Sequence, residues 1–250
     1  MSAEEHFQSL RYARMNARRL EHLATLALPI ESRTVLEIGA GVGDLTSFFL
    51  DRDCSVTSVE PRSGNVERFR ERYDGVRIWP PERLRIVQAD VHDFLELPDI
   101  GPHQVVFCYG LLYHLEEPGL AIGNMASRCS ELLLLETCVA HDRHDDWVRF
   151  HPEDPENVTN SITGHGCLPT RRWVFNRLRE HFDFVYMPLT QPALDQFRLD
   201  WRAKIVAKRR SRAVFVASRA ALMNSLLVEH VPDIQHARPS ERQDCDRPSS

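Results

Sequence analysis

The sequence lacks several features that would point to particular classes of protein. It has no apolar run of the roughly 18 residues that a membrane-spanning helix needs, and the N-terminal stretch MSAEEHFQSLRYARMNARR is too charged for a secretory signal. Its six cysteines are scattered and include no C-x-x-C pair, which favours buried thiols in a reducing, cytoplasmic setting over a disulfide framework. The formal net charge of −5 gives no general attraction to nucleic acid or to an anionic membrane.

What the chain does have is an alternation of short apolar runs with helix-length segments. Residues 1–29 form an N-terminal helical segment, because apolar side chains recur there at three- and four-residue steps. The runs that follow predict β-strands, and their spacing predicts β-α-β units with a mostly parallel sheet. The predicted strands are 34–38, 55–59, 84–88, 104–109 and 131–139.

The rhythm changes after residue 140. Residues 141–169 are rich in His, Asp, Pro, Asn and Gly without clear periodicity, and we interpret them as a long ordered loop or lid. A helix capped by Thr170, strands over 182–186 and 213–217 and a last helix over 220–229 complete a domain of residues 30–230. The polar, proline-containing residues 231–250 predict a disordered tail.

A glycine-rich turn directly after the first strand is the strongest chemical signal. It reads Glu37-Ile-Gly-Ala-Gly-Val-Gly43, so Gly39, Gly41 and Gly43 let a ligand approach the backbone closely. The G-x-G-x-G spacing differs from the G-x-G-x-x-G of dinucleotide-binding folds, and the sixth position is Asp44, which would repel a pyrophosphate. No G-K-[ST] follows, which excludes a P-loop.

Two acidic residues stand at the ends of the next two strands. Glu60 ends the second strand, where a carboxylate can accept hydrogen bonds from both hydroxyls of a ribose. Asp90 follows the third strand, where a carboxylate can accept a hydrogen bond from an adenine amino group. Parallel strands bring these tips to one carboxyl edge, which is where open α/β sheets bind ligands.

This order of motifs resembles the class I S-adenosylmethionine-dependent methyltransferase family, strongly over residues 30–140 and through the late strands to about residue 218. The resemblance implies an α/β fold with a Rossmann-like, doubly wound sheet of seven strands. The sheet would be mostly parallel with an antiparallel seventh strand, in three αβα layers.

The resemblance also implies a role for each residue of the motifs, with S-adenosyl-L-methionine as the cofactor. The glycine turn would lie against the methionine part, with Glu37 orienting its amino group. Glu60 would hold the ribose, and the third-strand tip would hold the adenine. The implied cofactor-binding residues are Glu37, Gly39, Gly41, Gly43, Glu60, Asp90, Val91, Tyr109 and Gly110, the last two beside the transferred methyl.

The segment after the fourth strand, Tyr109-Gly-Leu-Leu-Tyr-His-Leu115, is where the family brings methyl and acceptor together. His114 is a candidate general base, because its unperturbed pKa lies near neutrality. The alternative is that His114 only shapes the loop, since methyl transfer depends mainly on alignment. Tyr113 is expected to pack against or line the pocket, and Glu136 to be a buried carboxylate paired with an arginine.

Three residues farther along are candidates for acceptor binding. His144 lies in the sequence HDRHDD, which is only a weak metal-binding motif, so we predict no metal site. The alternative for this sequence is a solvated loop. His165 lies between two glycines, and Arg171 opens the helix capped by Thr170, where an anionic or hydroxylated ligand would be favoured. The alternative for this stretch is a packed loop.

The acceptor itself stays open at this stage. We favour an O or N atom of a small molecule, sugar-like or natural-product-like, because of the acidic net charge and the long polar segment 141–169. Residues 198–219 carry eight basic residues against Asp200 alone, so an RNA (tRNA) acceptor bound by the basic 198–212 segment is an alternative, and a solvated face is another. A non-catalytic protein with the same fold is a further alternative.

Overall fold

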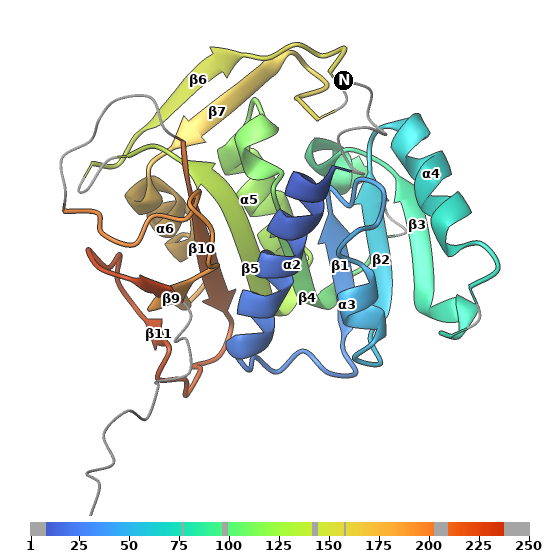
Figure 1. Cartoon of the computed structure of the whole chain (residues 1–250), viewed down its shortest axis with the longest axis horizontal. Coiled ribbons are helices and arrows are strands. Elements are labelled where there is room, and N and C mark those ends of the chain that lie inside the picture. Colours follow the sequence, from blue (N-terminus) through green and yellow to red (C-terminus); the bar gives the residue numbers. More distant parts are fainter. Residues whose placement is uncertain are drawn as a thin grey trace, which may run out of the picture.

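The chain folds around one twisted sheet with helices on both faces (Figure 1). The computed structural model describes residues 9–76, 78–96, 100–141, 145–157, 159–202 and 210–237. The main sheet has eight strands in the order β11-β8-β10-β5-β4-β1-β2-β3, and β10 lies antiparallel between β5 and β8. The predicted Rossmann-like α/β fold is therefore confirmed, with a short β11 as an additional strand at the edge.

Seven of the eight strands of the main sheet lie close to their predicted positions, and β11 was not predicted as a strand. The eight strands are β1 Thr34–Ile38, β2 Ser55–Glu60, β3 Leu84–Gln88, β4 His103–Tyr109, β5 Cys129–Val139, β8 Phe184–Pro188, β10 Ser211–Ser218 and β11 Leu227–Val228. Two small sheets add β6 Val148–Pro152 with β7 His165–Pro169, and β9 Thr190–Gln191 with β12 His236–Ala237.

The helices are α2 Leu10–Thr25, α3 Ser47–Leu50, α4 Ser63–Tyr73, α5 Pro118–Ser127 and α6 Arg171–Arg179. Short 3-10 turns are η1 Pro81–Arg83, η2 Val91–Glu96 and η3 Leu112–His114. The Ser9 hydroxyl caps α2 and the Thr170 hydroxyl caps α6, each accepting a hydrogen bond from the backbone N–H three residues on. None of the helices in the described ranges is both long and apolar enough to cross a bilayer.

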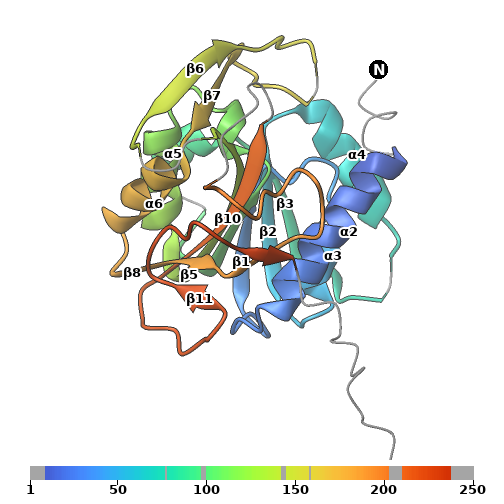
Figure 2. The ribbon, with the colours of Figure 1, turned by 60° about the vertical axis from the view of Figure 1, so that its left-hand side comes forward.

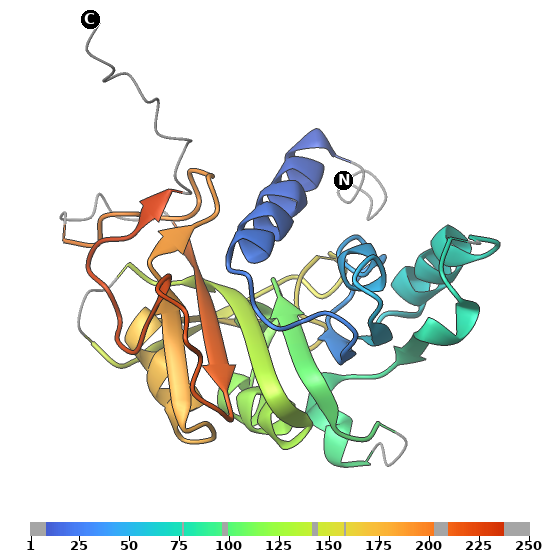
Figure 3. The ribbon, with the colours of Figure 1, turned by 90° about the horizontal axis from the view of Figure 1, so that it is seen from below.

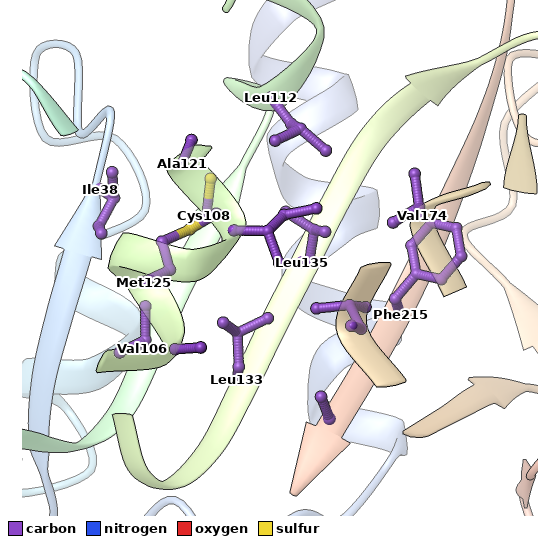
Figure 4. Packing of buried hydrophobic residues seen from close by; sticks show 14 of the residues in the cluster. Ile38, Val106, Cys108, Leu112, Ala121, Met125, Leu133, Leu135, Val174 and Phe215 are labelled. Carbon is purple, nitrogen blue, oxygen red and sulfur yellow. The ribbon is translucent and has the colours of Figure 1, made fainter. Parts of the chain in front are cut away.

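Two apolar cores lie on opposite faces of the sheet, because successive side chains of a buried strand point to opposite sides. In β4, Val106 and Cys108 pack with α5 and α6, whereas Val105 and Phe107 pack with α2 and α3. Figure 4 shows the first of these cores, and Figure 3 shows α2 on the other side of the sheet from α5 and α6. This arrangement is the predicted three-layer αβα sandwich.

The structure corrects three predictions for the second half of the chain. The segment 141–169 contains the hairpin β6–β7, which lies above the carboxyl edge of the sheet (Figures 1 and 2). Residues 220–229 contain no helix, because that stretch is a turn followed by β11. The predicted disordered tail starts too early, since β12 lies at 236–237 and Gln235 is buried; residues 238–250 lie outside the described ranges.

Candidate active site

A cavity of about 720 Å³ opens at the carboxyl edge of the sheet. Its walls come from parts of the chain that are far apart in sequence: the first half of α2, the tips of β1 to β4 with the loop after β4, the end of β5, the loop between β6 and β7, and the start of β10 with Gln196 beside it. Nine of the residues singled out in the sequence line this cavity. They are Gly39, Gly41, Glu60, Asp90, Val91, Tyr109, Gly110, Tyr113 and His114.

The glycine turn forms one wall with its backbone. Gly39 and Gly41 have φ angles of +70° and +57°, a region that side chains other than glycine rarely adopt. A Cβ on Gly39 would lie 3.0 Å from Leu111, so a side chain there would push into the next loop. The N–H of Gly41 donates a hydrogen bond to Oε2 of Glu60 at 3.0 Å, which ties the turn to the tip of β2.

Two residues of the motif lie behind the turn and not on the cavity wall. Oε2 of Glu37 accepts hydrogen bonds from the hydroxyls of Thr46 and Ser58 at 2.6 and 2.7 Å. Burial raises the pKa of Glu37 to about 7, although these two donors oppose the shift. Gly43 packs against Phe69, whose ring would lie 2.5 Å from an added Cβ. Both residues thus support the turn, and the structure does not place them among the lining residues.

The two carboxylates expected at strand tips do face the cavity. Glu60 is buried and its Oε1 accepts hydrogen bonds from Asn65 Nδ2 at 2.9 Å and from the N–H of Arg62 at 3.2 Å. Burial raises the pKa of Glu60, and these donors partly offset that rise. Asp90 accepts a hydrogen bond from the N–H of His92 and lies 2.9 Å from its Nδ1; although burial acts in the opposite direction, these contacts lower the pKa of Asp90.

The fourth strand ends at the middle of the cavity. The Tyr109 hydroxyl is buried and has no hydrogen-bond partner among the described residues. Gly110 has a φ of +87°, and an added Cβ would lie 3.1 Å from Nη2 of Arg19. Arg19 can therefore lie this close to the backbone of Gly110 only because Gly110 has no side chain.

His114 has a carboxylate partner that the sequence did not reveal. Its Nδ1 lies 2.7 Å from Oε2 of Glu153, and the two side chains are 14% and 5% exposed. Burial lowers the pKa of His114, whereas the Glu153 carboxylate raises it. For Glu153, burial raises the pKa, but the hydrogen bond and charge of His114 and the N–H of Ser161 outweigh it and lower the pKa to about 2. Glu153 is therefore ionised and accepts the Nδ1–H of His114, which leaves Nε2 as the basic nitrogen.

The hairpin holds Glu153 in a space that a glycine on β7 leaves open. A Cβ on Gly166 would lie 2.7 Å from Cδ of Glu153 and 2.9 Å from the carbonyl oxygen of Tyr113. The glycine after His165 thus provides the space that the Glu153 carboxyl occupies. Arg62 fixes the same loop, since its Nη2 lies 3.1 Å from the carbonyl oxygens of both Pro155 and Asn160.

A buried ion-pair cluster forms the wall beside Tyr113. Glu136, which is fully buried, lies 2.6 Å from Nη2 of Arg19 and 2.9 Å from Nη1 of Arg212. The expectation of an arginine partner for Glu136 is therefore confirmed. Arg19 was not among the residues expected at the site, because an arginine in an amphipathic helix ordinarily indicates the solvent face.

Of the three acceptor-binding candidates of the second half, the two that the structure describes do not line this cavity. His144 lies outside the described residues. His165 is 57% exposed and lies 3.8 Å from Glu116, and Arg171 is buried where it stacks on Trp201 and donates to the carbonyl oxygen of Pro232. Neither lines the cavity. Within the described ranges, no cluster of three or more His, Cys, Asp or Glu side chains could hold a metal ion.

Comparison with known proteins agrees with this geometry. A family model described as a methyltransferase domain matches residues 7–187. An uncharacterized protein from Synechococcus sp. is 27% identical over 96 residues, a match that covers 38% of this chain and only 22% of that protein.

Solved structures share the fold at low sequence identity. The N-terminal domain of EvdMO1 with S-adenosylhomocysteine bound is 21% identical, with a TM-score of 0.59 over 81% of this chain and 80% of that one. The glycopeptide N-methyltransferase MtfA is 19% identical, with a TM-score of 0.55 over 80% and 88%. The magnesium protoporphyrin IX methyltransferase of Synechocystis PCC 6803 is 13% identical, with a TM-score of 0.53 over 84% and 80%.

The family match extends from the N-terminal helix through β8 and includes the glycine turn, the carboxylates and the His114 loop. This chain therefore belongs to the methyltransferase-domain family, and its motifs resemble those of the class I, S-adenosylmethionine-dependent type.

Proposed function

We propose that this protein transfers a methyl group from S-adenosylmethionine to an oxygen or nitrogen atom of a small-molecule acceptor. One observation carries the proposal: a single cavity brings together the glycine turn, the carboxylates Glu60 and Asp90, and the basic nitrogen of His114. The two halves of this cavity offer different groups to a ligand. The half beside β1 to β3 suits a nucleoside, and the half beside β4, β5 and β10 suits a polar acceptor.

The nucleoside half fits the cofactor. The turn at Gly39 and Gly41 offers bare backbone at positive φ, and Glu60 and Asp90 offer carboxylate oxygens for ribose hydroxyls and an adenine amino group. Val91 lies beside Asp90 as an apolar surface for the adenine ring. When bound, the cofactor supplies a methyl group on a sulfonium, which is electrophilic without further activation.

The acceptor half contributes a base, His114, and the two residues that orient it, Glu153 and Tyr113. Glu153 holds His114 with Nδ1–H toward the carboxylate, so Nε2 is free to accept the proton that an acceptor hydroxyl or amine loses as it is methylated. The proton ends on His114, and the charge of the resulting imidazolium is stabilised by Glu153. Tyr113 packs its ring against that of His114, with 4.0 Å between ring centroids, and limits how far the imidazole can turn.

An RNA acceptor finds less support. Within the basic run 198–219, Arg212 forms an ion pair with the buried Glu136, and Arg219 donates hydrogen bonds to the backbone carbonyls of His181 and Ala126. Arg202 forms an ion pair with Asp200 at 3.0 Å. Lys204, Lys208 and Arg209 lie outside the described residues. The described part of the run therefore serves the fold and the cavity more than an open basic face.

We also place the enzyme in the cytoplasm. The five cysteines within the described residues are buried and form no disulfide, which suits a reducing compartment. None of them is needed by the proposed chemistry.

Transfer of a radiolabelled methyl group tests the proposal. The purified protein would be incubated with labelled S-adenosylmethionine and a cell extract separated into small molecules, RNA and protein. We expect label in the small-molecule fraction, and a much lower rate with His114→Ala. Label confined to RNA would refute the small-molecule acceptor, and no transfer to any fraction despite cofactor binding would refute the proposed activity.

A further inference from the structure

Two buried arginines and one buried carboxylate form a cluster in the acceptor half of the cavity. Arg19 of α2 and Arg212 of β10 both contact Glu136 of β5: Arg19 Nη2 lies 2.6 Å from Oε2, and Arg212 Nη1 lies 2.9 and 3.1 Å from Oε1 and Oε2. The side chains of Arg19, Arg212 and Glu136 are 2%, 9% and 0% exposed. Two guanidinium groups thus share one buried carboxylate.

The other partners of this cluster are neutral. Arg19 Nη1 donates to Asn16, Arg212 Nε donates to Gln196, and Arg212 Nη2 donates to the Tyr113 hydroxyl. Within the described ranges, Nε of Arg19 has no hydrogen-bond partner, and no second carboxylate forms an ion pair with either arginine. A buried charge without a counter-ion is unfavourable, so the cluster is built to receive an anion.

The position of the cluster indicates which ligand supplies that anion. Both arginines line the cavity, as do Arg210 and Gln196 at the start and flank of β10. Arg212 lies 5.1 Å from the centre of the Tyr113 ring, which in turn packs on His114. The positive charge therefore lies beside the proposed base, whereas the carboxylates for the nucleoside lie at the tips of β2 and β3.

Arginine side chains bind carboxylate and phosphate groups through paired N–H donors. We propose that the methyl acceptor carries an anionic group, a carboxylate or a phosphate, which binds at Arg19 and Arg212 while the acceptor hydroxyl or amine faces Nε2 of His114. This assignment rests on the proposed methyltransferase function and adds the class of acceptor. The carboxylate of the cofactor is the other possible source of the anion, and the test separates the two.

Calorimetry with matched probes tests the assignment. Benzoate, phenyl phosphate and benzamide would each be titrated into the complex of the protein with S-adenosylhomocysteine, and into the protein alone. We expect one of the two anions to bind at least about tenfold more tightly than neutral benzamide, as a charge-assisted hydrogen bond implies, and to bind without displacing S-adenosylhomocysteine. Which anion binds better distinguishes carboxylate from phosphate.

Variants link the anion to the arginines. Arg212→Gln should reduce anion affinity by about tenfold or more, Arg212→Lys should retain part of it, and affinity for S-adenosylhomocysteine should stay within about twofold. Arg177→Gln is the matched control, because Arg177 lies on α6 and pairs with Glu180 away from the cavity. If Arg212→Gln does not fold, Arg212→Lys takes its place, because it keeps the charge beside Glu136 but loses the paired N–H donors; unchanged anion affinity in that variant would then overturn the inference.

Three outcomes would overturn the inference: equal binding of benzamide and the anions, anion affinity unchanged in Arg212→Gln, or competition between the anions and S-adenosylhomocysteine. Competition would assign the cluster to the carboxylate of the cofactor. Failure of the protein to bind S-adenosylhomocysteine at all would instead refute the proposed function, whether or not the anions bind.

Discussion

Replacing Gly166 with alanine tests how the hairpin β6–β7 delivers Glu153 to His114. The new Cβ would lie 2.7 and 2.8 Å from Cδ and Oε1 of Glu153 and 2.9 Å from the carbonyl oxygen of Tyr113. Since ordinary contacts begin near 3.4 Å, these atoms would have to move by about 0.5–0.7 Å. Glu153 cannot yield freely, because His114 and the N–H of Ser161 hold its carboxylate at 2.7 and 2.8 Å. Overpacking of this kind costs about 1–3 kcal/mol.

The assay is urea unfolding of Gly166→Ala beside Gly119→Ala. Gly119 lies in α5, and no atom of the described residues comes within 4 Å of the place that an added methyl group would take, so alanine there should stabilise the helix by about 0.5–1 kcal/mol. The two substitutions are thus expected to have opposite signs. In methyl transfer, displacement of Glu153 should reduce turnover by roughly a hundredfold, the order of effect that a misplacement of about 1 Å causes. A Gly166→Ala protein as stable and active as wild type would refute this role of the hairpin.

Three further predictions concern the carboxylates and the base. Glu60→Ala should weaken S-adenosylhomocysteine binding by about tenfold or more in calorimetry, whereas Glu67→Ala on the exposed face of α4 should not; equal effects would remove Glu60 from the cofactor site. Glu153→Gln should lower the pKa of His114 further, because the carboxylate raises it, so the acidic limb of the rate profile should move to lower pH and the maximal rate should fall; an unmoved limb would contradict the dyad. The pKa of Glu37 is about 7 in the folded protein against 4.5 for a free glutamate, so its contribution to stability is present below about pH 4.5 and is lost as the pH rises through 7, by up to about 3 kcal/mol. The free energy of unfolding of Glu37→Gln, measured in urea, should therefore depend less on pH than that of the wild type. An identical pH dependence would refute the assignment of Glu37 as a buried acid.

Local patterns were sufficient to predict the strands and the glycine turn of the half that we propose binds the cofactor. The strand-turn-helix stretch around Gly39 and Gly41 needs only neighbouring residues to define it, and parallel strands necessarily bring Glu60 and Asp90 to the same edge. Glu37 and Gly43 belong to the same motif but lie behind it, because the sequence pattern does not distinguish a residue that lines a cavity from one that supports the turn.

The acceptor half depends on contacts between distant residues. Glu153 is 39 positions from His114, and Arg19 is 117 positions from Glu136, so no local periodicity connects them. The hairpin was predicted as a loop because residues 141–169 show no clear periodicity. β6 has the exposed Phe150 and ends at Pro152, and only its pairing with β7 identifies it as a strand. The helix predicted over 220–229 was wrong for a related reason: the sheet edge at β8 takes up Leu227 and Val228 as a strand.

A crystal structure of the complex with S-adenosylhomocysteine tests the central claim most directly. We expect the nucleoside between Glu60 and Asp90, the homocysteine along Gly39 and Gly41, and the sulfur directed toward the space that Nε2 of His114 faces. A nucleoside bound elsewhere on the protein, or a sulfur atom turned away from His114, would contradict the account.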